Sequence, residues 1–323
     1  MKSEFEFIEI LRRRYNLSKI GDDCAILPKD SKTDLVITTD LLVEDVDFKI
    51  EWSKPEFLGH KALAVSLSDV AAMGAKPVWA MLSIGIPKNV WKTDFVEKFY
   101  QGWFALAKKF DVELVGGDIS KTPDKIVIDS IVAGEVKRGK AIVRSGAKVG
   151  DLIFVSGELG GAAVGLRLLE SGIRYNSNAK TWQKNLLLKQ LQPSPKLSDG
   201  EFLRDNNLAT SMIDLSDGLS GDLAHICSAS KVGAKVYADQ IPFHKNLSSA
   251  ASSFDEKLEF ALNGGEDFEL LFTVNPKKYF QSENELKKRS FFQVGEVTVN
   301  IEMIELIFCE KSEILQPKGF QHF

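Results

Sequence analysis

The chain switches repeatedly between short β-branched runs and longer segments in which apolar residues follow helical spacing. Residues 34–40 carry Leu-Val-Ile-Thr-Thr between two acids, a run that is typical of a strand. Residues 60–73 are apolar on nearly every helical face, and Ser53 with Glu56 matches a capping box just before them. The pattern therefore predicts a strand followed by a buried helix that ends before Pro77.

The same two patterns predict further elements along the chain. We expect helices over residues 1–20, 90–110 and 162–170, and from the turn at 214–218 to about residue 230. We expect strands over residues 79–86, 112–115, 126–136, 152–155, 211–213 and 268–274, the second of which should stop at Gly116. Because strands and helices mix in both halves without strict alternation, the predicted fold class is α+β with two domains.

The stretch 137–150 is rich in Gly, Lys and Arg and is interpreted as a linker. We place the boundary there, with an N-terminal domain over 1–138 and a C-terminal domain over 139–323. The length of 323 residues suits two ordinary domains. Hydrophobic residues make up 44% and charged residues 27%, which is typical of a soluble globular protein.

Composition also argues against several classes of protein. No apolar run approaches the roughly 18–20 residues of a membrane helix, and the first residues lack the apolar region of a secretory signal. The 3 cysteines are far apart and without metal-binding spacing, which favours a reducing cytoplasm. A net charge of −4 with no basic tract argues against a nucleic-acid surface.

Acidic residues recur at the ends of predicted strands and in Gly-rich turns. They are Asp22, Asp23, Asp40, Asp118, Asp214, Asp217, Glu266 and Asp267. Any one of these motifs alone is better explained as a turn or a cap. Carboxylates and hydroxyls are, however, the hard oxygen ligands that suit Mg²⁺. Their recurrence favours a site that holds several divalent cations against the phosphates of a nucleotide.

Asp69 lies inside the apolar helix, at helical spacing from Leu58, Ala62 and Val65. A buried carboxylate without a partner is costly, so it should be protonated, hydrogen-bonded, ion-paired or metal-bound. Two interpretations stay open at this point. Asp69 either pairs with a buried arginine or backbone N–H groups, or it binds a metal.

The other candidate motifs are weaker. The turn from Asp214 to Gly218 precedes a helix, so Ser216 or Asp217 is either a plain N-cap or part of a cation and phosphate site. The segment 134–141 nearly matches a P-loop but ends on an alanine, which has no hydroxyl for Mg²⁺. The glycines of 157–161 are interpreted as a turn with close helix packing, His225 as a core or surface histidine, and Cys24 as a buried thiol.

Taken together, the motifs resemble one known family. They are Gly21-Asp22-Asp23-Cys24-Ala25, Thr39-Asp40, the helix around Asp69, Gly116-Gly117-Asp118, Arg144-Ser145-Gly146-Ala147, the turn from Ile213 to Leu219, and Gly264-Gly265-Glu266-Asp267. In this order the set resembles thiamine-monophosphate kinases, of the superfamily that includes aminoimidazole ribonucleotide synthetase. The likeness spans nearly the whole chain.

The resemblance implies an activity and an architecture. The activity is ATP-dependent phosphorylation of thiamine monophosphate to thiamine diphosphate, with Mg²⁺ as cofactor and ATP as co-substrate. The expected state is a cytoplasmic homodimer whose N-terminal sheets pair into a barrel. The N-terminal domain would bind ATP and metal and form the dimer, and the C-terminal domain would complete the active site.

The resemblance also implies roles for individual residues. Metal ligation is implied for Asp23, Thr38, Thr39, Asp40, Asp69, Asp118, Asp214 and Asp217, of which Asp69, Asp118 and Asp214 are the expected catalytic residues. Nucleotide contacts are implied for Gly117, Asp118, Arg144 and Ser216, and substrate contacts for Asp47, Glu266 and Phe320. Relatives can carry His at the position of Asp47. The acid here either suits the cationic thiazolium or marks a lost contact.

The expected chemistry is direct in-line transfer without a phosphoenzyme. The nucleophile is a phosphate oxygen that is already ionised near neutral pH, so no general base is required. Catalysis then rests on positioning and charge stabilisation. The alternatives are another ATP-using synthetase of the superfamily and a non-catalytic nucleotide or metal sensor.

Overall fold

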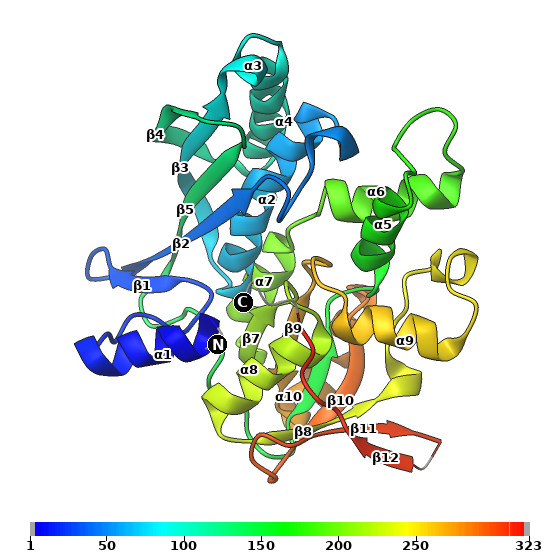
Figure 1. Ribbon diagram of the computed structural model, residues 1–323. Coiled ribbons are helices and arrows are strands. Elements are labelled where there is room, and N and C mark those ends of the chain that lie inside the picture. The colour runs from blue at the N-terminus through cyan, green and yellow to red at the C-terminus, as the bar shows by residue number, and fades with distance from the viewer. Residues whose placement is uncertain (1–3, 310, 320–323) are drawn as a thin grey trace.

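The computed structural model describes residues 4–309 and 311–319, and every structural statement below refers to them. Two β-sheets with helices packed against them follow one another along the chain, the first in the blue and teal half of Figure 1 and the second in the green to red half. This arrangement confirms the prediction of a mixed fold with two sheet-containing parts. The first sheet is not closed into a barrel within this chain.

The first sheet has the strand order β1-β2-β5-β3-β4 and is antiparallel except between β3 and β4. Its strands are β1 (Ala25–Pro28), β2 (Thr33–Val43), β3 (Lys76–Pro87), β4 (Glu113–Thr122) and β5 (Val127–Lys137). Strand β4 forms one edge and is exposed along most of its length.

The helices of this part are α1 (Glu4–Tyr15), the 3-10 turn η1 (Ile50–Trp52), α2 (Pro55–Ala72), α3 (Lys88–Trp91) and α4 (Phe95–Phe110). As predicted, α2 is buried around most of its circumference. A Cβ on Gly102 of α4 would lie 1.8 Å from the Glu56 carbonyl oxygen, so glycine permits α2 and α4 to touch along their backbones. This contact fixes α2 over the first sheet.

The second sheet has the order β12-β11-β8-β10-β6-β9-β7 and is antiparallel except between β8 and β11. Its strands are β6 (Leu152–Val155), β7 (Ala209–Asp214), β8 (Gly233–Tyr237), β9 (Leu270–Val274), β10 (Phe292–Thr298), β11 (Ile304–Phe308) and β12 (Lys311–Ile314). The helices of this part are α5 (Gly161–Glu170), α6 (Thr181–Leu191), α7 (Leu197–Asp205), α8 (Leu219–Ser230), α9 (Phe254–Asn263) and α10 (Pro276–Lys288), with 3-10 turns η2 (Ala238–Gln240) and η3 (Leu247–Ser249).

Three local predictions were wrong. Strand β4 does not stop at Gly116 but continues to Thr122, because it pairs with β3 along its whole length. The Ser53 hydroxyl does not cap α2 and donates instead to the Lys54 carbonyl oxygen at 3.0 Å. The helix expected over 90–110 is divided into α3 and α4, because the Thr93 hydroxyl accepts from the Phe95 N–H at 3.2 Å and starts a new helix.

Several elements of the second part were not predicted, among them α6, α7, β8 and β10. Their apolar residues are buried in contacts between distant segments, so local periodicity is weak. Among the described helices, none has the length and the apolar character that crossing a bilayer requires.

Candidate active site

The site begins where α2 lies across β2. Thr38 and Asp40 are two residues apart on β2 and therefore point to the same face, toward α2. The Thr38 hydroxyl donates to Asp69 Oδ2, and the Ser66 hydroxyl donates to Asp40 Oδ2 at 2.7 Å. Strand alternation and helical spacing thus bring acids from two elements together.

Two further carboxylates join Asp69 from distant segments. Asp23 comes from the turn before β1, and Asp214 from the end of β7 in the second sheet. Carboxylate oxygens of Asp23, Asp69 and Asp214 all lie within 4.8 Å of one another, and we call these three residues the acidic group. The Ser68 hydroxyl of α2 donates to Asp214 Oδ2 at 2.6 Å. Helix α2 therefore holds the two parts of the chain together at this point.

The crowding of these carboxylates changes their acidity. Burial raises the pKa of Asp69 well above its usual value, and Asp40, Asp214 and Asp23 raise it further. Burial, reinforced by Asp23, raises the pKa of Asp214 to about 8. Burial raises the pKa of Asp40 to about 6. In the ionised form these groups repel one another, and a divalent cation among them would remove that repulsion.

Asp23 supplies the observation that tests whether a cation fits. Its Oδ1 accepts from the Arg144 guanidinium, at 2.7 Å from one terminal nitrogen and 3.2 Å from Nε. Its Oδ2 is buried and has no hydrogen-bond partner among the described residues. An orphaned carboxylate oxygen within a set of hard oxygen donors suits Mg²⁺ better than a soft metal.

Arg144 and Cys24 take different places beside the group. The Arg144 backbone N–H donates to Asp22 Oδ1 at 2.6 Å, and its guanidinium donates to Asp23, so both acids of this turn hold Arg144. Burial lowers the pKa of Arg144, but the charge and hydrogen bonds of Asp23 raise it by more. The pKa of Arg144 therefore lies above its ordinary value. Burial, with Asp69 and Asp23, raises the pKa of the Cys24 thiol well above normal. Cys24 is therefore a buried thiol without nucleophilic character, as its sequence context predicts.

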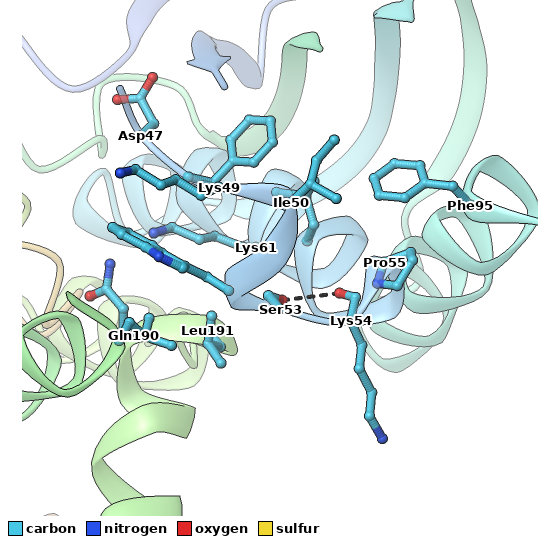
Figure 2. A pocket seen from close by; sticks show the side chains of 14 residues that line it. Asp47, Lys49, Ile50, Ser53, Lys54, Pro55, Lys61, Phe95, Gln190 and Leu191 are labelled. Atoms are coloured by element: carbon cyan, nitrogen blue, oxygen red, sulfur yellow. Dashed lines mark hydrogen bonds between the residues drawn. The ribbon is translucent and has the colours of Figure 1, made fainter. Parts of the chain in front are cut away.

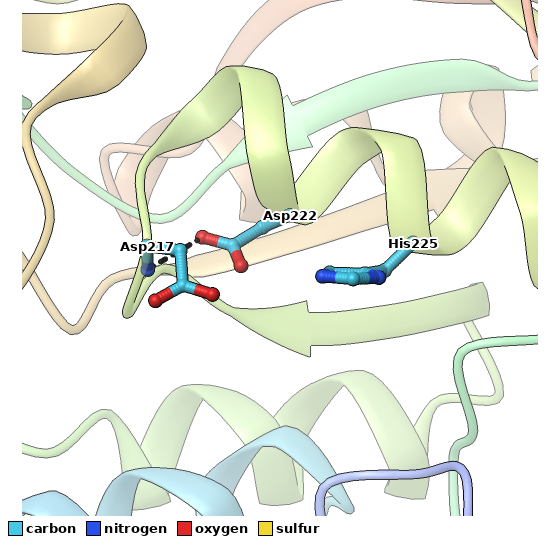
Figure 3. A group of neighbouring side chains, drawn as sticks. All are labelled: Asp217, Asp222 and His225. Carbon is cyan, nitrogen blue, oxygen red and sulfur yellow. Dashed lines mark hydrogen bonds between the residues drawn. The ribbon is translucent and has the colours of Figure 1, made fainter. Parts of the chain in front are cut away.

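A second cluster lies at the start of α8. Figure 3 shows Asp217, Asp222 and His225 facing one another, and potential ligand atoms of all three lie within 4.8 Å. Asp222 Oδ2 accepts from the backbone N–H groups of Asp217, at 3.2 Å, and Gly218, at 3.0 Å. Sequence reasoning missed Asp222, although its spacing of three from His225 places both on one helical face. Burial and then Arg144 lower the pKa of His225 to about 4, so this histidine is neutral at physiological pH.

Asp47 lines a hollow between η1, α2, α5 and α6, and Glu266 lies beside this hollow through its contacts with two lining residues. Asp47 lines it, with Val43 N–H donating to its Oδ2 at 2.7 Å. Lys61, only 4% exposed, lines it too and pairs with Glu266 at 2.6 Å. The Gln190 amide donates to the second Glu266 oxygen. Figure 2 shows Asp47, Lys49, Lys61 and Gln190 at one end, with Ile50, Pro55 and Phe95 at the other.

Ser216, in the turn between β7 and α8, is hydrogen-bonded to the backbone of Glu266. Its carbonyl oxygen accepts from the Glu266 N–H at 2.9 Å. Lys61 and Gln190 were not among the predicted site residues. A buried lysine in an apolar helix was a signal that could have identified Lys61.

Three predicted residues lie apart from the acidic group. The Thr39 hydroxyl points to the opposite face of the first sheet, where it donates to Asp129 at 2.6 Å. Asp118 is exposed on the edge strand β4, in the same cross-strand row as Ser83 and Asp129. A Cβ on Gly117 would lie 1.9 Å from the Leu82 carbonyl oxygen, so strand packing alone requires glycine there. Phe320 lies outside the described residues.

Backbone N–H groups of the Gly-rich turn before α5 donate to a carboxylate from a distant part of the chain. Asp267 accepts from the N–H groups of Gly160, at 2.6 Å, and Ala162, at 3.0 Å. The start of α5 is thus capped internally, which confirms the interpretation of this turn as structural.

Comparison with known proteins identifies the family. Models described as AIR synthase related protein, N-terminal domain and C-terminal domain, match residues 21–136 and 148–302. The chain is 38% identical over 333 residues to thiamine-monophosphate kinase of Buchnera aphidicola from Acyrthosiphon pisum, covering 99% of each chain. It is 39% identical over 308 residues to that of Escherichia coli K12, covering 94% of this chain and 91% of the relative. The chain belongs to the thiamine-monophosphate kinase family.

Solved structures of thiamine-monophosphate kinases share the whole architecture. One described as AaThiL complexed with AMPPCP and TMP superposes with a TM-score of 0.88 at 31% identity, covering 99% of this chain and 97% of that one. The enzyme from Stenotrophomonas maltophilia K279a gives 0.79 at 35% identity, covering 94% and 96%. The hydrogenase maturation protein HypE in complex with ATP, at 17% identity with a TM-score of 0.72, covers 97% of this chain and 94% of its own and shares the fold alone.

Proposed function

We propose that this chain transfers the γ-phosphoryl group of ATP to the phosphate of thiamine monophosphate, giving thiamine diphosphate and ADP. The observation that carries the proposal is the convergence of the acidic group with Arg144 at helix α2, which also lines a hollow with Lys61, the ion-pair partner of Glu266. Family membership over nearly the full chain supports it. A solved relative bound to an ATP analogue and TMP supports it as well.

The distance between the hollow at Lys61 and the acidic group at Asp69 suits an elongated substrate. Lys61 and Asp69 are eight positions apart on helix α2, a rise of roughly 12 Å. A molecule with two linked rings and a phosphate tail would extend along α2 from the hollow to the acidic group. In this arrangement Asp47 attracts the cationic thiazolium, Glu266 contacts the substrate beside Lys61, and the phosphate end reaches the reacting centre.

The reaction needs no general base. One oxygen of the substrate phosphate attacks the γ-phosphorus of ATP, the bond to the β,γ-bridging oxygen breaks, and ADP leaves. The second ionisation of a phosphate monoester has a pKa of about 6, so the attacking oxygen is already anionic at neutral pH. The protein must instead bring two polyanions together, and positioning with charge stabilisation dominates such catalysis.

Asp23, Asp69 and Asp214 would hold Mg²⁺, with Thr38, Asp40 and Asp217 close by. The ion supplies positive charge that screens the phosphates. Arg144 would contact the nucleotide, and its pairing with Asp23 orients the guanidinium toward the reacting centre. Ser216, joined to Glu266 through its carbonyl oxygen, would contact both substrates.

We further propose that two copies pair through the first sheet. Its face away from α2 carries Leu41 and Met81, which are exposed, beside the polar row of Ser83, Asp129 and Asp118. Strand β4 is an open edge, and sheet edges are commonly covered. Pairing would place Thr39, Gly117 and Asp118 at an interface, where they could contribute to the site of the partner copy.

Steady turnover is the direct test. Purified protein, ATP, Mg²⁺ and thiamine monophosphate should give one ADP per thiamine diphosphate. Oxygen-isotope labelling should show inversion at the transferred phosphorus, since one in-line displacement occurs. Net retention would indicate a phosphoenzyme. Binding of both ligands without turnover would favour the sensor alternative.

We propose the cytoplasm as the compartment, where ATP is available and the free thiols of Cys24, Cys227 and Cys309 stay reduced.

A further inference from the structure

The hollow next to Glu266 contains a buried hydrogen-bond acceptor that the chain itself leaves unused. Gln190, near the end of α6, is only 3% exposed and lines the hollow. Its Oε1 is buried and accepts no hydrogen bond from the described residues. A buried polar atom of this kind usually has a partner, because leaving it unpaired is costly.

The orientation of the Gln190 amide is fixed by its neighbour. Its Nε2 donates to a carboxylate oxygen of Glu266, and an ionised carboxylate can only accept. The other Glu266 oxygen accepts from Lys61 at 2.6 Å, so the carboxylate is held on both sides. Turning the amide over would place two acceptors against each other. Oε1 is therefore the atom left for a ligand.

The surroundings limit which ligand would supply the donor. Lys61 Nζ lies 2.6 Å from Glu266 Oε1, and among the described residues neither Lys61 nor any other group donates to Gln190 Oε1. The remaining walls near α6 include the apolar side chains of Leu169, Leu191 and Trp52. A flat ring with one N–H donor on its rim suits such a mixture of apolar surface and a single acceptor.

We propose that Gln190 is a specificity-determining residue whose Oε1 accepts a hydrogen bond from the exocyclic amino group of the aminopyrimidine ring of the substrate. The inference rests on the proposed function, and it names the atom that selects the substrate's pyrimidine. A purely structural Gln190, which only tethers Glu266 through Nε2, would affect all substrates alike. Selection through Oε1 would distinguish substrates that carry the amino group from those that do not.

The test compares thiamine monophosphate with its analogue in which an oxo group replaces the pyrimidine amino group. The wild-type enzyme should prefer the amino compound by about ten- to hundredfold in kcat/KM, because the analogue places an acceptor against Oε1. Gln190→Met, of similar volume, should reduce this preference to within about threefold. Gln192→Met is the matched control, since Gln192 lies just beyond the same helix and does not line the hollow.

Each outcome decides the inference. Equal kcat/KM for the two compounds in the wild type would overturn it while the kinase function stands. A preference that Gln190→Met leaves intact would assign selection to another residue and overturn it too. Should the Met variant fail to fold, Gln190→Asn, which keeps the amide but withdraws it, should show the same loss of preference. No turnover of either compound would refute the proposed function and this inference together.

Discussion

Asp69 is the residue on which the site depends most. It is the only member of the acidic group on α2, and it accepts from Thr38 while facing Asp23 and Asp214. The sequence left two interpretations open, an arginine or backbone partner and a metal. Among the described residues Arg144 pairs with Asp23 instead, so Asp69 has other carboxylates and a hydroxyl around it. This environment favours the metal interpretation.

Asp69→Asn should therefore lower kcat by at least about 10²-fold while the protein stays folded. Mg²⁺ should raise the Tm of the wild type by several degrees, and this shift should vanish in the variant. In a chelator the variant should be as stable as the wild type, because it relieves repulsion between carboxylates. Asp94→Asn, at an exposed site near the start of α4, is the control. An active Asp69→Asn enzyme would remove Asp69 from the proposed metal set.

Arg144 neutralises the buried Asp23 carboxylate and, in our proposal, contacts ATP. A second substitution, at Asp23, can separate these two roles. Arg144→Ala leaves the buried Asp23 carboxylate without its cation, which should cost about 3–5 kcal/mol in free energy of unfolding. It should also raise the KM for ATP by about tenfold or more. Adding Asp23→Asn should recover part of the stability but none of the ATP affinity. Urea unfolding and initial rates measure the two effects, and an unchanged KM for ATP would contradict the nucleotide role.

At the scale of elements, α2 organises the site. Its Ser66 donates to Asp40 and its Ser68 to Asp214, and it also carries Asp69, which accepts from Thr38, and Lys61, which pairs with Glu266. Its own sequence predicted a buried helix, since apolar residues cover nearly all of its faces. Nothing in that sequence indicated that α4 would press against it through glycine.

Gly102→Ala tests that contact. Helix propensity alone would favour alanine by about 1 kcal/mol. The added Cβ would meet the Glu56 carbonyl oxygen at 1.8 Å, so α2 and α4 must separate. We expect a net loss of at least about 3 kcal/mol and a fall in turnover, because α2 shifts with its acid-binding side chains. Exposed Ala105→Gly on the same helix should cost only about 1 kcal/mol. A neutral Gly102→Ala would show that the two helices can separate freely.

At the scale of the whole molecule, the site joins the two sheet-containing parts, because Asp69 comes from the first and Asp214 from the second. The face of the first sheet away from α2 stays open. Leu41 is 58% exposed there and Met81 38%, and this is apolar surface that the proposed pairing of two copies would cover.

Leu41→Asp should convert the proposed dimer to a monomer, because it would bury two new charges at a paired face. Sedimentation velocity at micromolar concentration measures this, with circular dichroism to check folding. Phe280→Asp, at a 74% exposed position on α10, should leave the dimer intact. A wild-type chain that sediments as a monomer would contradict pairing through this sheet.

The sequence by itself determined the strands and helices whose periodicity is strong, and the position of Asp214 at the end of its strand, whereas Asp40 and Asp118 lie inside strands that continue past them. Asp69 was assigned to a buried helix from spacing alone. Only the tertiary structure decided which acids meet. Asp23, Asp69 and Asp214 converge, whereas Asp118 stands on an exposed edge because β4 continues through the turn that glycines suggested. Convergence depends on sheet register and on contacts such as Ser68 with Asp214, 146 positions apart. Local pattern carries no information about these.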